Sequence, residues 1–141
     1  MTARWMTAIL GSSLLMAASC AGGSSPAEEV TVPAAATELN IEVQEFHFSP
    51  AIVAVPADQT VTVTVNNTGT IKHEWVVIAK GHEVDEQRHF AEDAVLFEVD
   101  DITQGTQSTK TFKIAQPGRY QLICAVEGHF SAGMHATLVV V

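Results

Sequence analysis

The chain has 141 residues, of which 47% are hydrophobic, and its formal net charge is −9. This length provides one domain with an ample core. Residues 20–141 hold six basic and sixteen acidic side chains, so this part carries a formal charge of −10. The acidic balance excludes nucleic-acid binding, which needs Lys and Arg to neutralise phosphates, and it favours a basic protein partner.

Residues 1–19 are predicted to be a lipoprotein-type signal peptide. A positively charged start precedes an apolar run from Met6 to Ala18, which is too short to span a bilayer. The small residues before Cys20 resemble a bacterial lipobox, with Ala17 where Leu is usual. Cys20 is therefore a candidate lipidation site, and ordinary cleavage that leaves it as an exposed thiol is the alternative. We expect an exported protein on the periplasmic side of the bacterial cell membrane, held to the membrane surface by lipid.

Residues 20–37 are rich in Gly, Ser, Pro and Ala without apolar periodicity, which predicts a flexible tether. From Leu39 onward, short segments alternate apolar and polar residues and are separated by turn signals. The predicted strands cover residues 39–48, 51–55, 60–66, 73–79, 94–99, 109–115, 120–124 and 136–141.

Three of these segments have distinctive patterns. The alternation in the first slips near Gln44, which predicts a bulge and turns Phe46 and Phe48 inward as a pair. Prolines flank residues 51–55, which favours a short edge strand. Residues 73–79 are more continuously apolar than the other segments, as in a central strand. The polar stretch 80–108 is predicted to be a long loop with a helical turn and one short strand.

Seven or eight short strands with turns between them predict an all-β domain over residues 38–141. The expected architecture is an antiparallel Greek-key β-sandwich.

Four residues form a candidate metal site. Cys124, His129 and Met134 are separated by four residues each in the run CAVEGHFSAGM, and His73 opens an earlier apolar strand. One thiolate, two imidazoles and one thioether make a soft ligand set, and His2Cys with a weak axial Met is typical of a blue-copper electron-transfer site. On a sandwich, these positions converge at one end of the strands.

Each residue alone has a simpler interpretation. A single buried thiol, a core methionine or a surface histidine is common. If Cys20 carries lipid, however, Cys124 has no disulfide partner in an exported chain, and metal binding explains it. Together with the spacing, this predicts one copper ion bound by the four residues.

The remaining histidines are weaker candidates. His47 is expected to face outward between two phenylalanines. His82 and His89 could bind a second cation with Glu86, although a solvated acidic loop is the simpler interpretation. His135 is expected to point away from the site, and it is a substitute ligand if Met134 does not bind.

The chain resembles the cupredoxins, the small blue-copper proteins. The likeness covers residues 39–141 and rests on FHFSPAIVAVPADQTVTVTVNNTGTIKHEWVV and YQLICAVEGHFSAGMHATLVVV. The loop spacing is most similar to auracyanin-type proteins, which are membrane-tethered. The resemblance implies that His73, Cys124 and His129 are equatorial copper ligands and that Met134 is axial. Four positions depart from the common family pattern: Glu74, Ala125, Glu127 and His135.

The leading hypothesis is a monomeric one-electron carrier in a bacterial respiratory or photosynthetic chain. Electron entry is expected through His129, inside an apolar rim of Val126, Phe130 and Ala132. The resemblance implies partners such as c-type cytochromes or a quinol-oxidising complex. The alternative is a copper-binding or delivery protein without redox turnover. An enzyme is not expected, since a dinuclear copper site needs a second cysteine where Gly128 stands. A metal-free sandwich is the remaining interpretation.

Overall fold

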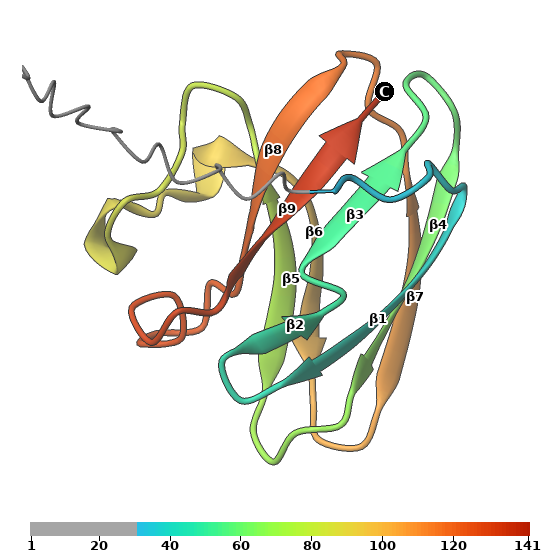
Figure 1. Ribbon diagram of the computed structural model, residues 1–141. Helices are drawn as coiled ribbons and strands as arrows, with labels where there is room; N and C mark the ends of the chain where they lie inside the picture. Colours follow the sequence, from blue (N-terminus) through green and yellow to red (C-terminus); the bar gives the residue numbers. More distant parts are fainter. Residues whose placement is uncertain (1–30) are drawn as a thin grey trace, which may run out of the picture.

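The computed structural model describes residues 31–141, so the predicted signal peptide and Cys20 lie outside the described residues. In this part of the chain, nine strands form two sheets that pack face to face (Figure 1). The strands are β1 (Glu38–Gln44), β2 (His47–Ser49), β3 (Ile52–Val55), β4 (Val61–Asn67), β5 (His73–Ile78), β6 (Val95–Ile102), β7 (Gln107–Phe112), β8 (Gly118–Ile123) and β9 (His135–Val140).

The sheets have the orders β2-β1-β4-β7 and β3-β9-β8-β5-β6. The predicted all-β sandwich is confirmed, with one strand more than the upper expectation. The expectation of purely antiparallel sheets is wrong, because β1 pairs with β4 and β3 pairs with β9 in parallel. The chain crosses from one sheet to the other between β2 and β3. In the segment from β1 to β3, the first strand therefore lies beside β4 and the last lies beside β9, and both partners are distant in sequence.

The core lies between the two sheets and follows from the alternation seen in the sequence. In β4, Val61, Val63 and Val65 are buried as predicted, while the intervening threonines are half-buried. In β5, five of six residues are buried, as expected of a strand between two neighbours. The expected edge strand, β3, lies at the end of its sheet. The last residues of the predicted tether also attach to the domain, since the Ala36 N–H donates to the Ala54 carbonyl.

The β5–β6 segment, residues 79–94, covers the outer face of the five-stranded sheet. It contains two short 3-10 helices, η1 (Gln87–His89) and η2 (Glu92–Ala94), in line with the predicted helical turn. A second, smaller apolar cluster lies beneath it and consists of Val76, Ile78, Val84, Ala94 and Ile123. The following strand, β6, has eight residues and is longer than expected. No helix within residues 31–141 is long and apolar enough to cross a membrane.

The turn between β1 and β2 differs from the prediction. Gln44 pairs directly with His47, so Glu45 and Phe46 form a two-residue hairpin turn in place of the expected bulge. Phe48 is buried, but Phe46 is 44% exposed and has a φ of +61°. The prediction that both phenylalanines point inward is therefore wrong for Phe46. A positive φ is unusual for a bulky residue, and this backbone conformation is kept only where contacts with the surrounding structure stabilise it.

Two leucines test the assignment of the core. Leu138 is fully buried in β9, whereas Leu96 is 46% exposed in β6. Leu138→Ala should lower the free energy of unfolding by about 2–5 kcal/mol because it leaves a cavity between the sheets. Leu96→Ala should change it by no more than about 0.5 kcal/mol. Chemical denaturation of both variants measures the difference, and equal losses would contradict the assigned packing.

Candidate metal centre

Three of the four predicted ligands meet at one end of the five-stranded sheet. His73 is the first residue of β5, Cys124 directly follows β8, and His129 lies in the connection to β9. Their possible ligand atoms all lie within 4.8 Å of one another, and all three residues are buried. Met134 is also fully buried and directly precedes β9. The geometry of this cluster agrees with the convergence that the sequence predicted.

The ligand loop, residues 124–134, is closed by its own backbone. The Cys124 N–H donates to the Met134 carbonyl (3.2 Å), and the Met134 N–H donates to the His129 carbonyl (3.0 Å). The turn before His129 passes through Gly128, whose φ of +84° suits glycine. The loop is therefore folded as tight turns, which fix the side chains of Cys124 and His129 relative to each other.

The buried polar atoms of the cluster have few hydrogen-bond partners in the part of the chain that the structure describes. Within residues 31–141, neither ring nitrogen of His73 has a hydrogen-bond partner, although both are buried. Cys124 Sγ lies 3.3 Å from Nδ1 of His129 and accepts a hydrogen bond from the Glu74 N–H (3.4 Å). Buried polar groups are nearly always satisfied. A cation that takes the sulfur and one nitrogen of each histidine would give a partner to three of these buried atoms at once, so the residues fit a metal ion.

Burial also sets the protonation of the ligands. It raises the pKa of the Cys124 thiol, an effect that the Glu74 N–H partly opposes. It lowers the pKa of both His73 and His129, and for His73 the neighbouring imidazole of His129 acts in the same direction. The metal-free cluster therefore favours neutral imidazoles, which are the form that binds a metal.

Phe46 covers the outer side of His129. The two rings are 5.4 Å apart between centroids and meet edge to face at 90°, and His129 is only 5% exposed. Of the predicted apolar rim, Ala132 is exposed, whereas Val126 and Phe130 are half-buried against the two apolar clusters. The alternation in the sequence did not indicate this contact, because it predicted that the Phe46 ring lies in the core.

Glu45 holds the turn that carries Phe46. Its Oε1 accepts hydrogen bonds from the N–H and hydroxyl of Thr70 and from the N–H of Ile71, the last two at 2.8 and 3.2 Å. These bonds, above all that from the Thr70 N–H, lower the pKa of Glu45 from 4.5 to about 2. A Cβ at Gly69 would lie 2.9 Å from the same oxygen and 3.0 Å from Cα of Gln44, so this close approach requires glycine. No sequence pattern indicated this contact.

The other histidines lie apart from the cluster. His89 Nδ1 is 2.5 Å from a carboxylate oxygen of Asp85, and Glu86 pairs with Arg88. Within residues 31–141, the cluster of His73, Cys124 and His129 is the only such metal-binding group, so the second cation site is not formed. His47 is exposed, as predicted. His135 is also exposed, while its neighbour Met134 is buried.

Comparison with known proteins decides the family. The family model for a cupredoxin-like domain matches residues 9–140. The chain belongs to the cupredoxin-like family. It is similar to auracyanin-B of Chloroflexus aurantiacus, with 30% identity over 88% of this chain and 59% of that protein. It is also similar to sulfocyanin of Sulfolobus acidocaldarius, with 23% identity over 72% of this chain and 59% of that protein. The chain thus spans about three fifths of the length of these relatives.

The fold is also similar to that of a solved structure of the same family. The structure of dithionite-reduced auracyanin from Roseiflexus castenholzii superposes with a TM-score of 0.66 and 23% identity, over 77% of this chain and 99% of that one. This likeness supports the cupredoxin fold. Family membership and the buried His2Cys cluster together identify the cofactor as one copper ion, as the sequence predicted.

Glu45→Gln should remove a part of the stability that depends on pH. Because the pKa of Glu45 falls from 4.5 to about 2 in the folded protein, its carboxylate stabilises the fold fully above pH 4.5. This contribution is lost as the pH falls toward 2. The difference in denaturation midpoint between wild type and Glu45→Gln should therefore shrink on acidification.

Glu42→Gln serves as the control for this experiment, because Glu42 is an exposed carboxylate on the neighbouring strand β1. A difference between wild type and Glu45→Gln that stayed constant from neutral pH to pH 2 would contradict the assigned role of Glu45.

Proposed function

We propose that the protein is a one-electron carrier with a mononuclear type 1 copper site. His73, Cys124 and His129 would hold the copper as its strong ligands, and Met134 would be a weaker fourth ligand. The cluster of three buried donors, in which His73 has no other partner within residues 31–141, is the observation that supports this proposal. Bound copper supplies a centre that alternates between its cuprous and cupric states, and thiolate and imidazole donors suit both.

The protein's part is to hold its ligands still. β5 positions His73, the end of β8 positions Cys124, and the backbone bonds of the ligand loop position His129. The Glu74 N–H donates to the sulfur and so reduces the negative charge on the thiolate. Ligands held by a rigid sandwich move little when the metal changes its charge, and a small rearrangement permits fast electron transfer.

The region around Phe46 is the proposed place of electron entry. Phe46 is exposed on one side and touches His129 on the other. Ile71, which is 41% exposed, is held near it by Glu45. A small apolar surface suits a weak and short-lived encounter with a redox partner.

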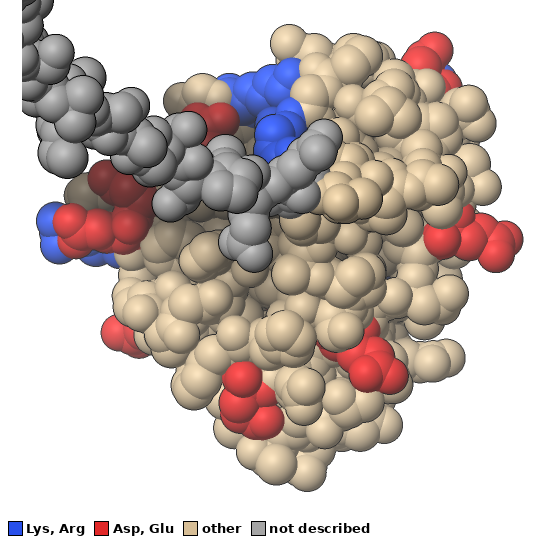
Figure 2. All heavy atoms as spheres, in the orientation of Figure 1, with Lys and Arg blue, Asp and Glu red and all other residues tan. Residues whose placement is uncertain are grey.

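Charge and anchoring define the proposed partners. Acidic side chains greatly outnumber basic ones, and Figure 2 shows several of them spaced around one face of the domain. Long-range attraction would steer a basic protein, such as a c-type cytochrome, toward this surface. A quinol-oxidising membrane complex is the proposed electron donor. Lipid on Cys20 would hold the monomeric domain at the periplasmic side of the cell membrane, within reach of both.

A copper-delivery protein is the competing function. The cysteine ligand argues against it, because delivery proteins in oxidising compartments favour Met and His. Titration of the full chain with Cu(II) separates the two functions. A carrier should develop an intense blue absorption band that a mild reductant bleaches reversibly, whereas a colourless complex would favour delivery.

Replacing the sulfur ligand tests the site directly. Cys124→Ala should abolish the blue band, because the band arises from the bond between the thiolate and copper. Cys20→Ala is the matched control, since it removes the other cysteine of the chain and should leave the band intact. Optical and EPR spectra measure both. A blue Cys124→Ala variant would show that the ligand assignment is wrong.

Met134→Leu tests the axial ligand. The change nearly conserves volume, so the stability of the copper-free protein should fall by less than about 1.5 kcal/mol. The blue band should remain, and the reduction potential should rise because a weak donor to Cu(II) is lost. Voltammetry measures the potential. An unchanged potential would exclude Met134 as a ligand.

A further inference from the structure

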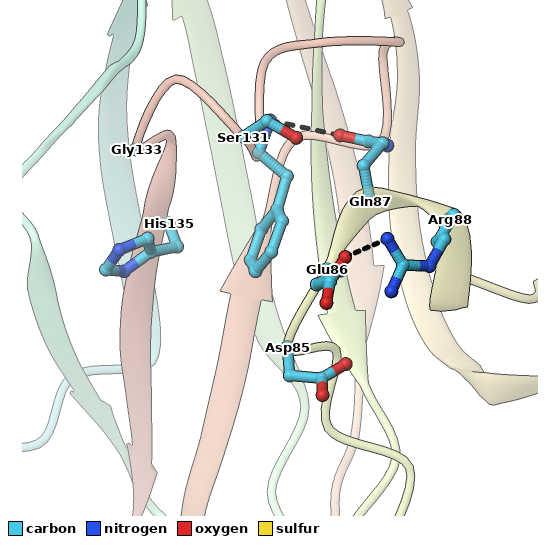
Figure 3. Close-up of a pocket in the computed structure, with 8 residues that line it drawn as sticks. Asp85, Glu86, Gln87, Arg88, Ser131, Gly133 and His135 are labelled. Atoms are coloured by element: carbon cyan, nitrogen blue, oxygen red, sulfur yellow. Dashed lines mark hydrogen bonds and ion pairs between the residues drawn. The ribbon is translucent and has the colours of Figure 1, made fainter.

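The side chain of Gln87 spans the ligand loop. Its Oε1 accepts a hydrogen bond from the Phe130 N–H (3.2 Å), and its Nε2 donates to the Ala125 carbonyl (3.3 Å). Ala125 directly follows Cys124, and Phe130 directly follows His129. One amide group therefore ties together the two residues next to the copper ligands of the loop. Figure 3 shows Gln87 reaching from η1 to this loop. Gln87 also lines a cavity of about 600 Å³.

The β5–β6 segment, which carries Gln87, is itself bound to the five-stranded sheet. The β5–β6 segment is attached to β8 by Gln121, whose Oε1 accepts from the Val84 N–H and whose Nε2 donates to the Val84 carbonyl, both at 2.7 Å. Val84 is only 4% exposed and belongs to the second apolar cluster, against which Ala125 and Phe130 also pack. The strand that leads to Cys124 thus holds the segment, and the segment in turn holds the loop.

The residue after the first ligand does not provide such a brace. This residue is Glu74, one of the four positions that depart from the common pattern of the family. The Glu74 N–H reaches the sulfur of Cys124, while its carboxylate lies 3.6 Å from Nζ of Lys72. The Glu74 side chain also lines a second cavity, together with Glu98 and Asp100. Its carboxylate is an acceptor and has no N–H to offer a loop carbonyl.

We propose that Gln87 is a positioning residue of the metal centre, bridging Ala125 and Phe130 so that the sulfur of Cys124 and the imidazole of His129 keep a fixed separation. This inference rests on the proposed copper site. A primary amide suits the role, since it offers a donor and an acceptor to backbone groups of opposite polarity. Without the bridge, the half-buried Phe130 N–H loses its partner, and the loop gains freedom between the two ligands.

The first test uses the copper-free full chain, where the metal cannot hold the loop. Gln87→Leu removes both hydrogen bonds, and amide hydrogen exchange at Phe130, followed by NMR, should become about fivefold faster or more. Gln87→Glu keeps the acceptor for Phe130 and loses the donor to Ala125, so exchange at Phe130 should stay slow. Gln107→Leu, an equivalent change at an exposed position of β7, is the control and should leave exchange at Phe130 unchanged.

The second test uses the copper-loaded variants. Gln87→Leu should change the copper hyperfine splitting in EPR and shift the reduction potential, whereas Gln107→Leu should change neither. Exchange at Phe130 that is as slow in Gln87→Leu as in wild type would overturn the bridge. Faster exchange with an unaltered EPR spectrum and potential would overturn the positioning role. If wild type itself forms no blue site, the proposed function fails, while the exchange result still decides whether the bridge exists.

Discussion

The thiol of Cys124 and the imidazoles of His73 and His129 are buried together at one end of the sandwich. The contacts around this end of the domain depend on the burial of these three groups. Burying His73 with no hydrogen-bond partner for either ring nitrogen within residues 31–141 costs free energy that packing alone does not return. A metal ion would offset part of this cost, because it would be held by one nitrogen of His73, the sulfur of Cys124 and the ring of His129 at the same time. Metal binding and local stability are therefore coupled.

Three contacts from outside the ligand loop hold the buried donors in place. The backbone of β5 reaches the sulfur through the Glu74 N–H. The β1–β2 turn places Phe46 against His129 and is fastened by Glu45. The β5–β6 segment reaches the loop through Gln87. These contacts come from both sheets and from a connecting segment, so the geometry of the site depends on the whole domain.

The sequence predicted most of the strands and the meeting of His73, Cys124 and His129, but not the contacts that surround this cluster. The alternation in β4 and the spacing from Cys124 to Met134 are local patterns, and local patterns are visible in a sequence. The parallel pairing of β3 with β9 depends on a crossover between sheets, which alternation does not encode. Phe46 was misplaced because a two-residue turn and a bulge shift the alternation in the same way. No sequence pattern indicated the role of Gln87, since its hydrogen-bond partners are backbone groups about forty residues away along the chain.

X-ray absorption at the copper edge, recorded on the loaded full chain in both oxidation states, would show whether the fold holds His73, Cys124 and His129 in place around one copper ion. We expect one short bond to sulfur and two to imidazole nitrogen, with nearly the same distances in the cuprous and cupric forms. A spectrum without a short sulfur bond would contradict the assignment of Cys124. A coordination shell that changed markedly on reduction would contradict the claim that the fold holds the ligands in place.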